Sequence, residues 1–172
     1  HQPVGRGIGP ALEARDVLAV MRGSPDAPAD LRTRALAVTG ALLDLALGTS
    51  AGHGLTLATQ TLDSGRAWAK FLAICEAQGG FTEPGEAPFQ APVVAASAGH
   101  IKAIDNRRLA KVAKLAGAPA AALAGVVCSL RIGDPVAAGQ TLYTVHAQSP
   151  GERDYALAYA KAHPDILSLE VP

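Results

Sequence analysis

Three glycines at the start of the chain have a spacing that could serve chemistry. Gly5, Gly7 and Gly9 precede an expected helix in "VGRGIGPALE". A glycine-rich loop before a helix can present backbone N–H groups to a phosphate at the positive end of the helix dipole. The spacing is neither the Walker pattern nor a GxGxxG after a strand. From the residues alone, a tight turn packed closely on a neighbour is the stronger interpretation.

A row of basic side chains is the second candidate. They lie on a helix expected after an N-cap at Asp105 or Asn106 and before a C-terminal stop at Gly117. The spacing i, i+4, i+7 places on one face Arg107, Lys111 and Lys114. The opposite, apolar face carries Leu109, Val112 and Ala116. A phosphate-binding stripe is one interpretation, and the solvated face of an amphipathic helix is the favoured one.

The remaining reactive side chains form no recognisable set. No pair has metal-ligand spacing among His53, His100, His146 and His163. The carboxylates are scattered, and neither an acid/base dyad nor a nucleophile with its base can be assembled. Cys75 and Cys128 lie far apart in apolar surroundings, which favours buried, reduced thiols over a metal site or a disulfide. From the residues alone, no catalytic set can therefore be assembled in this chain.

A β unit between Arg131 and Ala147, "RIGDPVAAGQTLYTVHA", resembles a sequence motif of biotinyl and lipoyl carrier domains. Glycine turns separate its short strands, and the expected inward residues are Leu130, Ile132, Val136, Leu142 and Val145. A carrier needs an exposed lysine at the tip of the following hairpin, and that position falls on Ser149. No lysine occurs between Lys114 and Lys161. A carrier role is therefore disfavoured, although a carrier-like fold is compatible with the pattern.

Composition excludes several classes of partner. The 172 residues carry 15 basic and 15 acidic side chains, which gives no electrostatic case for nucleic acid or an anionic membrane. No apolar run is long enough to be a transmembrane helix. With no signal peptide in view, a cytoplasmic location is expected. The chain begins at His1 without an initiator methionine, which indicates a piece of a longer protein.

The elements that would position these residues change in kind along the chain. Helices are expected over about 10–22, 31–47 and 57–78, the last with a break near Ser64–Gly65. In the second helix a well-buried apolar set is expected: Leu31, Leu36, Val38, Leu42, Leu43 and Leu45. Short strands and two further helices follow, and "DILSLEVP" is expected as a tail. This order predicts an α+β fold, with residues 1–79 helical, 80–92 a linker and 93–172 a second domain.

Three stretches resemble the last third of the thymidine phosphorylase (pyrimidine nucleoside phosphorylase) family, in the branch that includes AMP phosphorylases. They are "QPVGRGIGPALEARDVL", "SGRAWAKFLAICEAQGG", and "GHIKAIDNRRLAKVAKLAGAP" together with "GDPVAAGQTLYTVHA". The resemblance implies that residues 1–79 are the C-terminal helical part of an α/β domain. It implies that residues 93–172 are an α/β-hammerhead domain shaped like a barrel-sandwich hybrid. The glycines then belong to the turn after a strand, beside the active site rather than in it.

The resemblance also implies an activity. The family is a group of pentosyltransferases that cleave the N-glycosidic bond of a nucleoside or nucleotide with phosphate, releasing a base and a sugar 1-phosphate. Its phosphate- and base-binding residues precede the matching region, so the resemblance implies no catalytic and no substrate-binding residue in this chain, which alone is expected to be inactive. Cytoplasmic homodimers are expected, with no nucleic-acid or membrane partner. The alternative is a non-catalytic structural or carrier-like domain.

One binding site of the family falls inside the chain. No cofactor is required, but bacterial members hold a potassium ion through two carbonyl oxygens and a carboxylate. The matching positions are Val4, Gly7 and Asp16, where Asp16 stands in place of a glutamate. Hard oxygen ligands of this kind suit such an ion. Without the ligands that other members supply from upstream, weak binding at most is expected.

Overall fold

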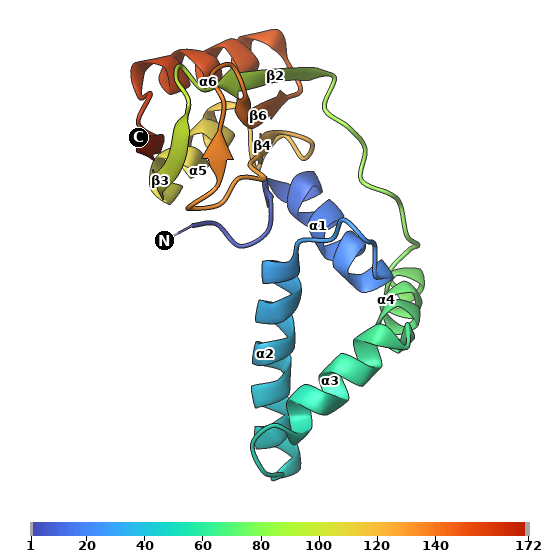
Figure 1. Cartoon of the computed structure of the whole chain (residues 1–172). Coiled ribbons are helices and arrows are strands. Elements are labelled where there is room, and N and C mark those ends of the chain that lie inside the picture. The colour runs from blue at the N-terminus through green and yellow to red at the C-terminus, as the bar shows by residue number, and fades with distance from the viewer. Residues whose placement is uncertain (1, 171–172) are drawn as a thin grey trace. The chain divides into compact units, whose positions relative to one another are not determined.

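The computed structural model describes residues 2–170 and combines helices with antiparallel strands, which confirms the predicted α+β class (Figure 1). The chain forms two compact units. The helical unit comprises residues 16–83. The mixed unit joins the chain up to Arg15 with the chain from Pro84 onward. No helix within residues 2–170 is long and apolar enough to cross a membrane.

The helical unit follows the expected order of helices. These are α1 (Pro10–Arg22), which begins in the mixed unit, α2 (Ala29–Leu47), α3 (His53–Asp63) and α4 (Arg66–Ala77). The predicted break near Ser64–Gly65 is confirmed, because Gly65 adopts a φ of 76° between α3 and α4. Helices α2 and α3 meet at their connection and diverge from there (Figure 1). They approach closely because both carry a glycine, Gly40 and Gly54, at the crossing.

The mixed unit contains two sheets and two helices. The first sheet has the order β1 (Gly7–Ile8), β4 (Gly125–Val127), β6 (Thr141–Ala147), β2 (Phe89–Val94). The second has the order β5 (Pro135–Val136), β3 (Gly99–Ile104), β7 (Leu167–Glu170). Helices α5 (Asn106–Leu115) and α6 (Pro150–Ala162) pack against each other and against the first sheet (Figure 1). The expected tail is therefore partly a strand.

One hydrophobic core fills the mixed unit. Its fully buried side chains include Ile101, Leu109, Val112, Val126, Val145 and Ile166. Of the inward residues expected in the β unit, Val136, Leu142 and Val145 are buried and Leu130 is half-buried. The expectation for Ile132 is wrong, since its side chain is 45% exposed. It lies in the turn between Arg131 and Asp134, outside any strand.

The start of the chain belongs with the C-terminal strands. Strand β1 pairs with β4 in antiparallel register, Gly7 opposite Val127. This division differs from the linear domains expected from the sequence, because a two-residue strand carries residues 2–15 into the mixed unit. No periodic pattern in the sequence is long enough to indicate so short a strand.

The prediction that α2 is well buried is wrong. Only Leu36 and Gly40 of this helix are buried. Val38, Leu42 and Leu45 are 53%, 61% and 81% exposed. Helix α3 covers the side of α2 that carries Gly40, and the residues on other sides are left at the surface. An apolar pattern predicts which residues avoid water, but it does not say which polypeptide covers them.

Candidate functional site

Main-chain and side-chain hydrogen bonds join residues 2–8 to the chain just after β4. The Cys128 N–H donates to the Arg6 carbonyl at 2.8 Å. The Arg131 guanidinium donates to the Gly5 carbonyl at 2.9 Å, and the Ile132 N–H donates to Oε1 of Gln2 at 3.0 Å. Arg131 thus joins the β unit singled out in the sequence to the glycine segment. The sequence offered no signal for this contact, which spans more than a hundred residues.

The glycine segment has the geometry of a packing turn. The N–H of Gly9 donates to Oε1 of Glu13 at 2.9 Å, and the N–H of Ala11 donates to the Ala122 carbonyl at 3.0 Å. A phosphate at the start of α1 would have to displace the Glu13 carboxylate. A Cβ at Gly7 would lie 2.5 Å from the Leu12 carbonyl carbon, so glycine is needed for close contact with α1. These contacts favour the close-packed turn over the phosphate loop.

The three residues matched to the potassium site lie in different surroundings. Val4 lies in a bend, and its residue is 43% exposed. Gly7 is in the edge strand β1. Because the Arg6 carbonyl faces β4 and successive carbonyls alternate along a strand, the Gly7 carbonyl faces the outer edge. Asp16 belongs to the helical unit and is 5% exposed. Their oxygen atoms are the hard donors that a potassium ion takes.

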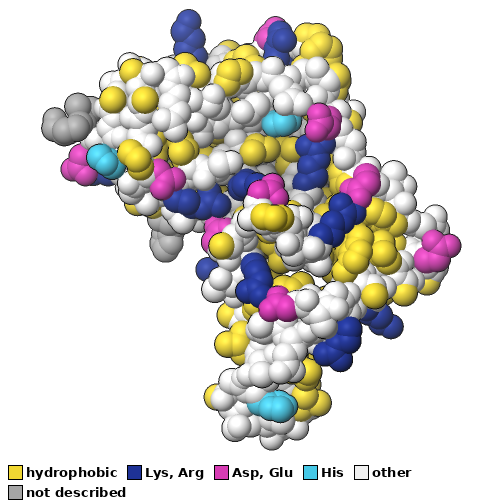
Figure 2. Space-filling model, turned by 45° about the vertical axis from the view of Figure 1, so that its right-hand side comes forward, with side chains coloured by type: hydrophobic (Ala, Val, Ile, Leu, Met, Phe, Trp, Pro, Cys, Tyr) yellow, Lys and Arg dark blue, Asp and Glu magenta, His cyan; other side chains and the backbone are white. Residues whose placement is uncertain are grey.

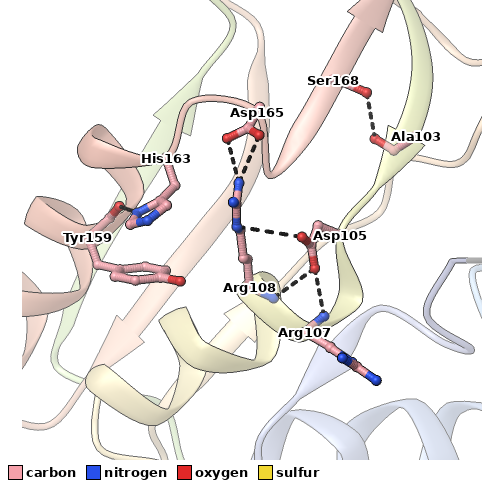
Figure 3. A network of polar contacts seen from close by, with 8 residues as sticks. All are labelled: Ala103, Asp105, Arg107, Arg108, Tyr159, His163, Asp165 and Ser168. Atoms are coloured by element: carbon pink, nitrogen blue, oxygen red, sulfur yellow. Dashed lines mark hydrogen bonds and ion pairs between the residues drawn. The ribbon is translucent and has the colours of Figure 1, made fainter.

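A polar network joins α5 to the turn before β7 (Figure 3). Asp105 is the N-cap of α5, as predicted, and accepts from the N–H groups of Arg107 and Arg108, both at 3.0 Å. The Arg108 guanidinium contacts both carboxylate oxygens of Asp165 at 2.7 and 2.8 Å. Arg107 points away from this network in Figure 3. The network is partly exposed, and its Asp165 also lines a hollow of about 750 Å³ with mainly apolar walls.

The basic row on α5 has the character of a solvated face. Arg107, Lys111 and Lys114 are all exposed, while Leu109 and Val112 on the other side are fully buried. The Gly117 N–H donates to the Lys114 carbonyl at 3.1 Å, and Gly117 has a φ of 115°. The helix therefore ends as predicted. This arrangement favours the interpretation as an amphipathic helix over a phosphate stripe.

The histidines lie in separate environments. His53 and His100 are exposed, and the His163 ring stacks on Tyr159 with centroids 4.1 Å apart (Figure 3). His146 on β6 is only 7% exposed, and its Nδ1 has no hydrogen-bond partner among the residues that the structure describes. Within residues 2–170, no three His, Cys, Asp or Glu side chains are grouped so as to hold a metal ion.

His146 gives the mixed unit a pH dependence. Burial lowers the pKa of His146 below its usual value of 6.5. Arg15 lowers this pKa further, and Glu86 opposes it. The neutral ring is favoured in the folded state, so its contribution to stability is complete above pH 6.5 and is lost as the pH falls through the folded-state pKa. The melting temperature should therefore decrease as the pH is lowered from about 7.5 to about 5.5.

A thermal unfolding series over this pH range, for the wild type and for His146→Gln, checks the prediction. The variant keeps a polar side chain that does not titrate, so its melting temperature should depend less on pH. Exposed His100 provides the matched control, since His100→Gln should leave the pH dependence as it is. Equal pH dependence in the wild type and in His146→Gln would contradict the assignment.

Ser149, where a carrier would have its lysine, has a structural role. Strand β6 leads into α6 at this point, and no hairpin follows. The Ser149 hydroxyl accepts from the Glu152 N–H at 3.3 Å and donates to Oε2 of Glu152 at 2.9 Å. Ser149 is thus the N-cap of α6. A serine at a helix start, in place of a lysine at a hairpin tip, argues against the carrier interpretation.

The two cysteines are free thiols, as predicted. Cys128 is buried, and burial raises the pKa of its thiol above the usual value. It therefore stays protonated and unreactive at neutral pH. Cys75 is only half-buried, so the expectation of full burial holds for one of the two.

The chain is similar in sequence to known proteins. Residues 100–166 match the family model described as the pyrimidine nucleoside phosphorylase C-terminal domain. The chain is 58% identical over 168 residues to "Putative thymidine phosphorylase 1" of Acidovorax sp. (strain JS42), a match that covers 98% of this chain. It is 56% identical over 165 residues to "Putative thymidine phosphorylase" of Ralstonia nicotianae, covering 96% of this chain.

The match covers only part of those relatives. It takes in 33% of the Acidovorax protein and 32% of the Ralstonia protein. The chain therefore spans about a third of the length of the curated relatives it matches, and that third is their C-terminal one.

Proposed function

We propose that the chain is the C-terminal part of a thymidine phosphorylase-type enzyme, because residues 100–166 match the model of the pyrimidine nucleoside phosphorylase C-terminal domain. The observation that carries the proposal is the match along 98% of the chain at 58% identity. Within the proposal, the helical unit is the end of the enzyme's α/β domain. The mixed unit contains the hammerhead domain.

The proposed reaction is phosphorolysis of a pyrimidine nucleoside. A phosphate oxygen forms a bond to C1′ of the sugar while the C1′–N bond to the base breaks. The base leaves with the electron pair of that bond and takes up a proton, and the products are the base and a (deoxy)ribose 1-phosphate. The reaction needs donors that hold phosphate and charged groups that stabilise the departing base. We propose that these groups belong to the part that precedes the matching third in the relatives.

The features of this chain fit a supporting role. The glycine segment, the α5 row and the Arg108 network are each occupied in packing or exposed to solvent. The enzyme would act in the cytoplasm as a homodimer, with a nucleoside or nucleotide and phosphate as its substrates. Its preferred base and sugar would be set by the preceding part.

The test compares two polypeptides. One is the 172-residue chain, and the other is the joined polypeptide, in which this chain replaces the matching third of the Acidovorax relative. Each is incubated with phosphate and with thymidine, uridine or AMP, and base release is followed by absorbance. The joined polypeptide should release base only when phosphate is present, and the chain alone should not. Release by the chain alone would show that the catalytic groups are misplaced in this proposal.

We also propose that the joined polypeptide binds a potassium ion through the carbonyls of Val4 and Gly7 and the carboxylate of Asp16. An ion that binds only the folded state raises its melting temperature. Potassium should therefore stabilise the joined polypeptide more than the same concentration of lithium, with little difference for the chain alone. Asp16→Asn should remove the difference, whereas Glu13→Gln, one turn away, should keep it. Equal melting temperatures in both salts would rule out the site.

A further inference from the structure

Helix α2 presents a regular apolar stripe on its surface. Five apolar residues follow one another along this helix at intervals of four, three, four and three residues. We call this set the α2 stripe: Leu31, Ala35, Val38, Leu42 and Leu45. The exposed fraction rises along the helix to 61% at Leu42 and 81% at Leu45. Figure 2 shows hydrophobic side chains at the surface of this unit. The alternation of four and three is the pattern by which one helix packs along another at a shallow angle.

The surroundings of the stripe do not suit water. Between Ala35 and Leu47 the only charged residue is Asp44. Its carboxylate accepts from the N–H groups of Gly52 and Gly54 at 2.9 and 2.7 Å, and these bonds hold the pKa of Asp44 below its usual value. The Asp44 carboxylate is thus hydrogen-bonded to the start of α3. Leu31 and Ala35, at the start of the stripe, line the hollow inside the helical unit, whereas Val38, Leu42 and Leu45 are exposed.

The other helices of the helical unit also bury few side chains. Helix α4 has no buried residue, and α3 buries only Gly54 and Ala58. Between the four helices lies a hollow of about 530 Å³, and the apolar side chains around it include Val20, Met21, Leu36, Leu43, Leu57 and Leu62. In the mixed unit, by contrast, α5 alone buries Leu109, Val112 and Ala113. Helices with so much apolar surface are normally covered by further polypeptide.

The relatives indicate what the covering polypeptide is. This chain matches the C-terminal 33% of the Acidovorax protein, so about two thirds of that protein lies before the match. We propose that the α2 stripe docks an apolar α-helix from this preceding part of the polypeptide. The proposal rests on the same relatives as the proposed function, but it does not require phosphorolysis. A helix is the occupant because the stripe has the spacing of a helix-packing seam.

Hydrogen exchange tests the docking in the 172-residue chain and in the joined polypeptide. Docking should slow exchange of the α2 amides at least about ten-fold in the joined polypeptide. The double variant Leu42→Glu/Leu45→Glu should abolish that gain, because docking would bury two carboxylates in an apolar seam. In the chain alone both positions are exposed, and the variant should shift the melting temperature by less than about 2 °C. Tyr155→Glu, at a 75% exposed position on α6, is the matched control and should keep the protection.

Three results would overturn the proposal. They are equal exchange of α2 in the two polypeptides, protection that survives the double variant, and a dimer of the chain through the stripe that persists in the joined polypeptide. If the joined polypeptide is insoluble, the chain is coexpressed with the preceding two thirds of the relative as a separate polypeptide. A one-to-one complex that the double variant loses supports docking, and no complex refutes it. Protection without base release would refute the proposed function and leave docking intact.

Discussion

Gly125→Ala is expected to destabilise the mixed unit by about 3 kcal/mol or more. Gly125 begins β4 with a φ of 153°, a conformation that residues with a Cβ rarely adopt. A Cβ there would lie against the Ile8 carbonyl and 2.9 Å from Cδ1 of Leu12. Both neighbours come from the start of the chain, so the substitution would push β1 and the first turn of α1 away from β4.

Urea unfolding of the wild type and of Gly125→Ala measures the loss, and hydrogen exchange at the Cys128 amide shows whether the contact with Arg6 is lost first. Gly133→Ala is the matched control. Gly133 also has a positive φ, 95°, but within residues 2–170 no heavy atom beyond its two chain neighbours lies within 4 Å of a Cβ built there. It should cost only the backbone strain, about 1 kcal/mol. Equal losses in the two variants would contradict the close packing of residues 2–15 against β4.

Leu109→Ala is expected to cost about 2–5 kcal/mol of the free energy of unfolding. Leu109 is 0% exposed on the inner face of α5, among side chains that are themselves fully buried, including Ile101 and Val112. Truncation removes apolar contacts and leaves a cavity that a core closed on all sides cannot collapse to fill. Lys111→Ala, on the exposed face of the same helix, should change stability by less than about 0.5 kcal/mol.

The chain offers a probe for each unit in this experiment. Trp68, the single tryptophan, lies in the helical unit, whereas Tyr143, Tyr155 and Tyr159 all lie in the mixed unit. Leu109→Ala should lower the urea midpoint reported by the tyrosines. A loss below about 1 kcal/mol would mean that this core is not the main source of the unit's stability.

The sequence predicted correctly those features that depend only on residues adjacent along the chain. The N-cap at Asp105, the stop at Gly117 and the break at Gly65 depend on a few adjacent residues, and all three are confirmed. Strand β7 was missed because its pairing with β3 joins segments more than sixty residues apart. The same limit applies to β1 and to the bond between Arg131 and Gly5.

Burial on α2 was mispredicted for a different reason. The apolar residues have the periodicity of a buried helix, and that periodicity is real. Among the described residues Val38, Leu42 and Leu45 are left exposed, so a helical apolar pattern led to a wrong prediction of burial. The candidate site had the same difficulty, because the motifs here resemble those of a family whose reacting groups we propose to lie in the preceding part.

Formation of a sugar 1-phosphate from thymidine and phosphate, followed by phosphorus NMR, tests the central claim most directly. The joined polypeptide should produce a new phosphomonoester signal in step with the release of thymine, because the phosphate oxygen becomes bonded to C1′. The 172-residue chain under the same conditions should leave the phosphate signal unchanged. Phosphomonoester formation by the chain alone, or thymine release by the joined polypeptide without that signal, would contradict the account.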